Sequence, residues 1–262
     1  MPVGTCRLCQ SKAVELRDSH ILPLWAYKRI RSDSYAGDPN PVRVTAEKAF
    51  QTSKQVTEYM LCPRCEQRIG NTENYVSSLA YTTEGNPGKL MQHILPPDFN
   101  QNPSVPGSVS LKQLSTNKIV FFACSVVWRA CVTKYKNIRK PSLGKKYEAA
   151  IREYLNGKKP LPKNVRIIMS MLDPKKCVLN DFHNLVTFPL TQKKDGYHRH
   201  LFFICGIYFE LCIGNVMPQF FETMCLYHGN EKLIPILAPN KIGLFQDIAK
   251  QVKNVARSKK FL

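Results

Sequence analysis

The sequence lacks long apolar runs, repeats and low-complexity tracts. No apolar run approaches the roughly 20 residues that a membrane-spanning helix needs. The N-terminus, MPVGTCRLCQSKAVEL, does not have the basic-then-apolar order of a secretory signal peptide. Hydrophobic residues make up 44% of the chain and aromatic residues 10%, which is enough for a packed core. We therefore expect a folded protein with no membrane segment and a cytoplasmic location.

Acidic residues are also scarce, and this leaves a strong positive charge. The chain has 38 Lys and Arg against 19 Asp and Glu, a formal net charge of +19. Residues 1–100 carry 12 basic and 10 acidic side chains, whereas residues 101–262 carry 26 and 9. Such an excess indicates a polyanionic partner, of which nucleic acid, here expected to be DNA, is the commonest. An acidic protein or an anionic lipid surface is the alternative.

The ten cysteines fall into two groups. Two CxxC pairs supply four thiolates, the ligand set of a closed tetrahedral zinc site, and they are Cys6, Cys9, Cys62 and Cys65. The other six are scattered among apolar neighbours, a spacing typical of core cysteines rather than of a disulfide framework. The pattern predicts a structural zinc ion that leaves no open coordination position for catalysis.

A proline-rich stretch, LPPDFNQNPSVPGSVS, predicts a linker over residues 95–110. It would separate a zinc-stabilised module, residues 1–94, from a basic α+β domain, residues 111–262. In the second part the pattern predicts a buried helix from residue 116 and another over 142–157 that ends at Gly157. Strands are expected over 165–172, 184–190 and 198–214, with an antiparallel hairpin at Asp195-Gly196. The last predicted helix covers residues 242–262.

A histidine and two carboxylates follow the CxxC pairs. The first pair leads into ELRDSHILP, a predicted strand that carries His20. The second leads into CEQRIGNTENYVSSLAY, a predicted helix with Glu66 and Glu73 two turns apart on one face. Zinc would then hold the histidine against the carboxylates. Alternatively, His20 is a structural histidine and the glutamates only complement the helix dipole.

In its order of CRLC, SHILP and LCPRCE, the segment 6–75 resembles the zinc-containing branch of the HNH, or ββα-metal, nuclease family. Together with the later WRA helix, the pattern is similar to bacterial proteins described as HNH-like. The resemblance implies an α+β fold in which a small HNH-like module precedes the basic domain with its antiparallel sheet. It implies hydrolysis of DNA phosphodiester bonds, with His20 as general base and one catalytic Mg²⁺ or Mn²⁺. A role in bacterial defence or in a mobile element fits the same family.

Two positions differ from the family pattern. Ser19 stands where an Asp or Glu metal ligand usually precedes the histidine, and Glu66 stands where His or Asn usually follows the last cysteine. We expect Glu66 to hold the metal together with Glu73 or Asp18. Asp18 should share a strand face with His20, so it could instead orient the imidazole. The alternative function is that of a non-catalytic, zinc-containing nucleic-acid-binding protein.

Three further residues have less certain roles. His198 and His200 share a strand face, but no third ligand is evident, so they are interpreted as surface or core histidines. Arg129 lies beside Trp128 in the predicted central helix. It is either a buried structural arginine or a phosphate contact.

Overall fold

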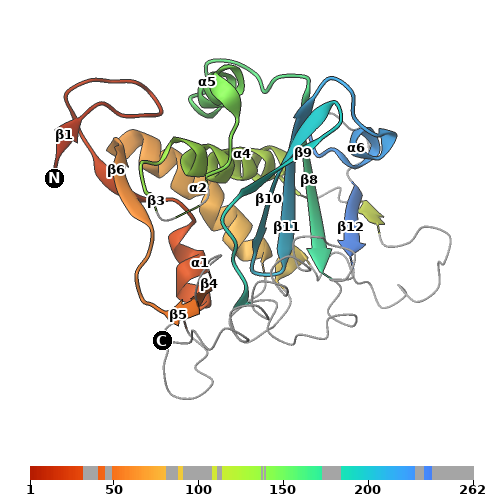
Figure 1. Cartoon of the computed structure of the whole chain (residues 1–262), viewed down its shortest axis with the longest axis horizontal. Coiled ribbons are helices and arrows are strands. Elements are labelled where there is room, and N and C mark those ends of the chain that lie inside the picture. Colours follow the sequence, from red (N-terminus) through yellow and green to blue (C-terminus); the bar gives the residue numbers. More distant parts are fainter. Residues whose placement is uncertain are drawn as a thin grey trace.

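The computed structural model of the chain describes residues 1–31, 41–44, 49–80, 88–90, 108–110, 114–136, 138, 140–172, 184–227 and 233–237. A central helix, α4 (Thr116–Val132), separates the N-terminal elements from a six-stranded sheet (Figure 1). Helix α2 (Pro63–Leu79) packs on one side of α4, and strand β11 (Ile207–Gly214) packs on the other. The fold is mixed, with helices and largely antiparallel sheets, as the sequence predicts.

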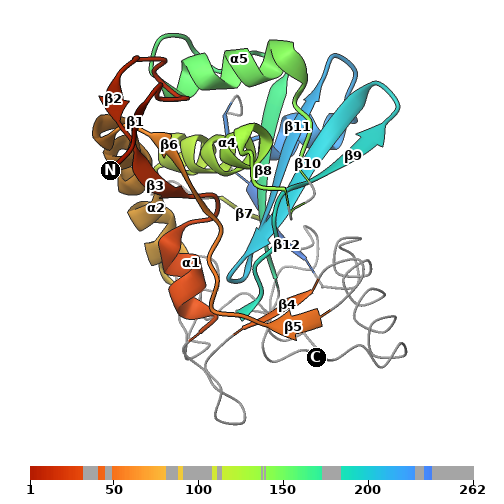
Figure 2. The same cartoon turned by 60° about the vertical axis from the view of Figure 1, so that its left-hand side comes forward.

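Among its described residues, the N-terminal part contains three two-stranded antiparallel sheets and the helices α1 and α2. Its remaining elements are β1 (Val3–Gly4), β2 (Val14–Glu15), β3 (Arg17–His20), α1 (Leu24–Arg29), β4 (Val42–Val44), β5 (Ala49–Gln51) and β6 (Thr57–Leu61). Strand β3 pairs with β6, and α2 follows β6 directly, so two strands and a helix lie together (Figure 2). Pro63 suits the first position of α2 because that position needs no N–H donor. The identity of this unit as an HNH-like module stays a prediction.

The large sheet has the strand order β7-β12-β8-β11-β10-β9. All its neighbours are antiparallel except β12 and β8, which are parallel. Its other strands are β7 (Ser108–Ser110), β8 (Val165–Leu172), β9 (Leu190–Lys194), β10 (Tyr197–Ile204) and β12 (Leu233–Leu237). A short helix, α6 (Gln219–Met224), follows β11.

Tight turns connect the central hairpins of this sheet. The predicted Asp195-Gly196 turn joins β9 to β10, with Gly196 at φ 83°. Cys205 and Gly206, at φ 44° and 87°, join β10 to β11. In the Cys205-Gly206 turn, positive φ at both central residues matches the right-handed twist of the paired strands. Gly196 and Gly206 adopt positive φ without the steric cost of a side chain.

Helix α4 confirms the predicted buried central helix. Its Phe122 ring lies 6.3 Å from the Phe202 ring and 5.5 Å from the Phe209 ring of the sheet. The other predicted helix is α5 (Gly144–Leu155), and Gly157 follows its end at φ 74°, a conformation that favours glycine.

The strand expected over residues 184–190 is largely wrong. Only an isolated bridge, Val186 to Ile204, precedes β9. The hydroxyl of Thr187 accepts a hydrogen bond from the Phe203 amide, at 2.8 Å, in place of a main-chain carbonyl. Pro189 has no N–H to extend the ladder. Both features stop regular pairing before Leu190.

Residues on both sides of the predicted domain boundary belong to one hydrophobic cluster. It joins Cys6 and Ile69 of the N-terminal part to Trp128 and Phe209. Residues 108–110 of the predicted linker form β7, and 95–107 lie outside the described residues, as does the predicted helix 242–262. The division into domains stays a prediction.

Within the described part of the chain, no helix combines the length and the apolar character needed to cross a membrane. The expected cytoplasmic location stays a prediction.

Candidate metal centre and adjoining pocket

The two CxxC pairs come together as the sequence predicts. Cys6 and Cys9 lie in the turn between β1 and β2, and Cys62 and Cys65 lie at the start of α2. The four sulfur atoms all lie within 4.8 Å of one another. Three of the cysteines are buried and Cys9 is half-buried. Four thiols at this spacing could hold a structural metal such as zinc.

Main-chain geometry prepares the cluster for a metal. The Gln10 amide donates to the Cys6 carbonyl at 2.9 Å, which closes the first turn, and Gln10 has φ 64°. The Cys62 amide donates to the Cys6 sulfur at 3.3 Å. A hydrogen bond with Cys65, opposed by burial, lowers the pKa of the Cys6 thiol to about 4, and the same contact raises that of Cys65. The cluster thus favours a thiolate, the form that binds metal.

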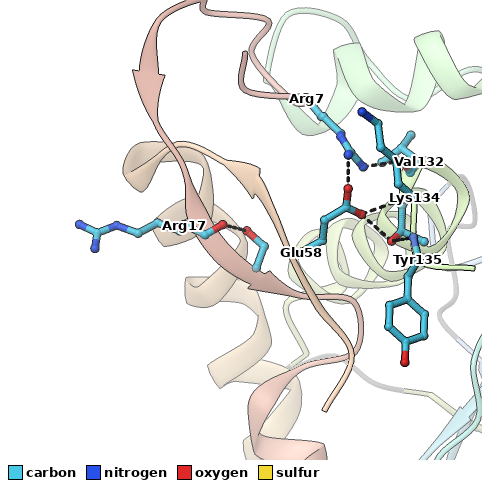
Figure 3. A network of polar contacts seen from close by, with 8 residues as sticks. Arg7, Arg17, Glu58, Val132, Lys134 and Tyr135 are labelled. Atoms are coloured by element: carbon cyan, nitrogen blue, oxygen red, sulfur yellow. Dashed lines mark hydrogen bonds and ion pairs between the residues drawn. The ribbon is translucent and has the colours of Figure 1, made fainter. Parts of the chain in front are cut away.

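A polar network fastens this turn to the end of α4 (Figure 3). Arg7, between the first two cysteines, forms an ion pair with Glu58 of β6 and donates to the Val132 carbonyl at 2.6 Å. Glu58 also accepts from the Thr133 hydroxyl at 2.7 Å and from the Lys134 amide at 2.8 Å. Burial alone would raise the pKa of Glu58, but the hydrogen bonds from Arg7 and Thr133 outweigh it and lower the pKa.

A pocket of about 360 Å³ lies where β3, α1 and α2 meet. Its walls include His20 at the end of β3, Trp25 and Lys28 of α1, and Glu66 and Glu73 of α2. Three of the four residues predicted for catalysis therefore line one cavity. Zinc would fix the first turn of α2, which carries Glu66.

Asp18, the fourth predicted residue, is exposed and does not line the pocket. The sequence offered Glu73 or Asp18 as the second metal ligand beside Glu66, and of these two the pocket contains Glu73.

Ser19 explains one departure from the family pattern. It is fully buried, and its hydroxyl donates to Glu66 Oε2 at 2.5 Å. It therefore orients a carboxylate on α2 rather than presenting one itself. Among the described residues, no other group hydrogen-bonds to the Glu66 side chain, so its Oε1 has no protein partner.

His20 is held by a residue that the sequence motifs do not reveal. Its Nε2 lies 2.5 Å from Gln55 Oε1, just before β6, and its ring packs 5.9 Å from that of Tyr27. With the amide oxygen as acceptor, Nε2 carries the proton and Nδ1 is left as the basic nitrogen. Gln55 belongs to no recognisable motif.

Arg129 is buried, in agreement with one of its two sequence interpretations. It is 1% exposed; Nη1 donates to the His20 carbonyl at 2.7 Å and Nη2 donates to Glu73 Oε1 at 2.5 Å. A lone arginine in an otherwise apolar helix was the available sequence signal, but only the structure identifies its partners. Glu73 Oε2 has no further partner in the described part of the chain.

The pocket carboxylates are less tightly grouped than the cysteines. Within the described residues, only the four cysteines form a cluster of three or more potential ligands at metal-binding separation. Two carboxylates alone suit Mg²⁺, which commonly keeps several waters and takes one or two protein ligands. His200, by contrast, is a core histidine: it is fully buried, and its Nδ1 lies 3.0 Å from Thr191 Oγ1.

Fold and site together define a mixed α/β protein with a four-cysteine cluster suited to zinc and a polar pocket beside it. Compared with protein-family models, with curated proteins and with solved structures, the chain matches none of them. Its relation to the HNH family stays a prediction.

Proposed function

We propose that the protein is a metal-dependent, HNH-like endonuclease that hydrolyses phosphodiester bonds of DNA. The observation that supports this most is the shared pocket of His20, Glu66 and Glu73 beside the four-cysteine cluster. Each of the three is fixed by a neighbour, respectively Gln55, Ser19 and Arg129. A hydrolytic site requires metal-binding carboxylates and a general base that are each held in one orientation.

In this proposal His20 is the general base. Gln55 holds one ring nitrogen, and the other accepts a proton from the attacking water at neutral pH. The Glu66 and Glu73 oxygens that have no partner among the described residues would hold Mg²⁺ or Mn²⁺, because hard cations prefer carboxylate oxygen. When bound, that cation supplies positive charge to stabilise the phosphate and the leaving oxygen. Zinc would be structural and would take no part in hydrolysis.

Nucleic acid as substrate is supported by charge. The excess of basic residues lies mainly in residues 101–262, and most of the described lysines there are exposed. Lys28 brings a cation into the pocket itself. Phosphate contacts of this kind are largely independent of base sequence. A role in bacterial defence or in a mobile element is part of the proposal only through the family resemblance.

The second candidate is a non-catalytic, zinc-containing protein that binds nucleic acid. The observation that favours it is that, among the described residues, only the four cysteines form a cluster of three or more potential ligands at metal-binding separation. The two functions differ in their metal requirement: cleavage needs added Mg²⁺ or Mn²⁺ while zinc stays bound, and binding does not.

The test is cleavage of plasmid DNA by wild type, His20→Ala and His198→Ala, with Mg²⁺, with Mn²⁺ and with neither. His198 is an exposed histidine on the sheet and serves as the matched control. Zinc content and folding are compared first. We expect metal-dependent cutting by wild type and His198→Ala and a loss of about 100-fold or more in His20→Ala. Retained DNA binding without cleavage in all three would favour the second candidate.

A further inference from the structure

We infer that Arg129 is a positioning residue of the candidate site, an inference that rests on the proposed function. Its guanidinium contacts the main-chain carbonyl of His20 on β3 and the carboxylate of Glu73 on α2. Arg129 itself belongs to α4, far along the chain from both. One side chain thus sets the distance between the strand that carries the base and the helix that carries a metal ligand.

The chemistry of arginine suits this position. Nε also points to an acceptor, the Ser125 carbonyl of its own helix at 3.4 Å, so all three guanidinium nitrogens have partners. The planar group fixes the angles between these contacts, whereas the single ammonium of lysine cannot reproduce them. With only 1% of Arg129 exposed, water cannot substitute for a lost partner.

The same contact selects which oxygen of Glu73 is available. Nη2 occupies Oε1, which leaves Oε2 for a cation in the pocket. Partners that orient a metal ligand from outside typically change metal affinity or activity by about 10–100-fold when they are replaced. Arg129 therefore links metal binding in the N-terminal part to the packing of α4 against the sheet.

The sheet offers a matched control, Arg199–Glu210. Arg199 of β10 donates to Glu210 of β11 at 2.5 Å, and the two side chains are 22% and 8% exposed. Neither residue lines the pocket. Arg199→Lys weakens a comparable ion pair without altering the candidate site.

The experiment uses the full zinc-loaded chain as wild type, Arg129→Lys and Arg199→Lys. Zinc content and thermal unfolding establish that the variants fold. Mn²⁺ binding is followed by the electron paramagnetic resonance of free Mn²⁺, and duplex cleavage is measured in single turnover as Mn²⁺ is raised. We expect Arg129→Lys to need about 10-fold or more Mn²⁺ for half-saturation in both assays, with Arg199→Lys within about twofold of wild type.

Equal Mn²⁺ binding and equal cleavage by the two variants, with an active wild type, would overturn the role of Arg129 and leave the proposed nuclease intact. A wild type that neither binds Mn²⁺ nor cuts would overturn the nuclease, and with it this role. Should Arg129→Lys fail to fold, side-chain ¹⁵N resonances of arginine in the wild type replace it. Addition of Mg²⁺ must then shift the Arg129 Nη resonance, and the Mg²⁺ concentration at the midpoint of this shift must equal that for half-maximal cleavage. An unchanged resonance overturns the inference.

Discussion

At the scale of single residues, buried polar side chains determine how the pocket is arranged. Ser19 and Arg129 are both fully enclosed, and each uses its hydrogen bonds to hold one carboxylate of α2. Burying a hydroxyl or a guanidinium is unfavourable unless each donor finds an acceptor. The two glutamates supply those acceptors, so the same contacts satisfy the core and orient the pocket.

Replacement of Ser19 should separate these two effects. Ser19→Ala removes one hydrogen bond and should cost about 1 kcal/mol of unfolding free energy. The Mg²⁺ concentration needed for half-maximal cleavage should rise about 10-fold. Ser19→Asp places a buried carboxylate against Glu66 and should cost about 3 kcal/mol. Urea unfolding and Mg²⁺ titration of cleavage measure both effects. Higher activity in Ser19→Asp would show that position 19 faces the metal after all.

His200 should make the protein sensitive to mild acid. Burial, aided by repulsion from His198, lowers the pKa of His200 to about 4. In the unfolded chain the pKa is near 6.5, so below that pH the unfolded state binds the additional proton. Stability should therefore fall by about 3 kcal/mol in total as the pH drops from 6.5 towards 4.

Urea unfolding of wild type, His200→Leu and His198→Gln at pH 7, 5.5 and 4.5 measures this effect. His200→Leu should lose most of the acid sensitivity, whereas His198→Gln, at an exposed position, should keep it. An equally steep decline in His200→Leu would assign the proton uptake to other groups.

At the scale of elements, α2 serves two sites. Cys62 is its N-cap, its first turn carries Cys65 and Glu66, and Glu73 lies two turns further along. A metal bound by the cysteines would fix the position and rotation of the helix, and hence the direction of both carboxylates. The turn between β1 and β2 that carries Cys6 and Cys9 is called the knuckle. Arg7 of the knuckle and Glu58 of β6 attach it to the end of α4, through the Val132 carbonyl and the Lys134 amide.

Glu58→Gln should loosen this connection between the knuckle and α4. A neutral amide weakens the pair with Arg7, and we expect a loss of about 2 kcal/mol of unfolding free energy and faster release of zinc to a chelator. Glu222→Gln is the control, because its pair with Arg166 is more exposed and should contribute less than about 1 kcal/mol. Thermal unfolding and a colorimetric zinc assay follow the two effects. Identical zinc release from both variants would show that the network does not hold the knuckle.

At the scale of the whole molecule, basic side chains from both halves of the chain lie around α2. Lys28 of α1 lines the pocket, and Arg64 is an exposed residue of α2. Arg68 of α2 donates to the Leu155 carbonyl at 3.3 Å, which places the end of α5 and the exposed Lys158 next to this helix. Exposed cations from both halves of the chain thus lie around α2.

Binding of duplex DNA by His20→Ala protein should depend strongly on salt, and the cations around α2 should account for that dependence. The logarithm of the binding constant falls as the logarithm of the salt concentration rises, and each lost phosphate contact makes this slope shallower by about 0.9. The triple change Lys28→Gln, Arg64→Gln, Lys158→Gln should therefore lower the slope by about 2–3. An equal charge change at the β9–β10 hairpin and before α5, Lys140→Gln, Lys193→Gln, Lys194→Gln, should lower it by less than about 1. Fluorescence anisotropy of a labelled duplex measures both, and equal slopes would argue against a defined binding face.

Local patterns in the sequence determined much of this protein. Apolar periodicity predicted α4 and α5, and Asp195-Gly196 predicted a hairpin, because each depends on neighbours along the chain. CxxC spacing predicted the metal cluster because each pair of thiols is local and four thiolates complete one tetrahedral site. Tertiary structure alone decided which groups surround the pocket. Gln55 reaches His20 across 35 positions, and Arg129 reaches Glu73 across 56 and His20 across 109. The Gln55 contact arises from the pairing of β3 with β6, and the Arg129 contacts arise from the packing of α4 between the sheet and α2. No local propensity encodes either.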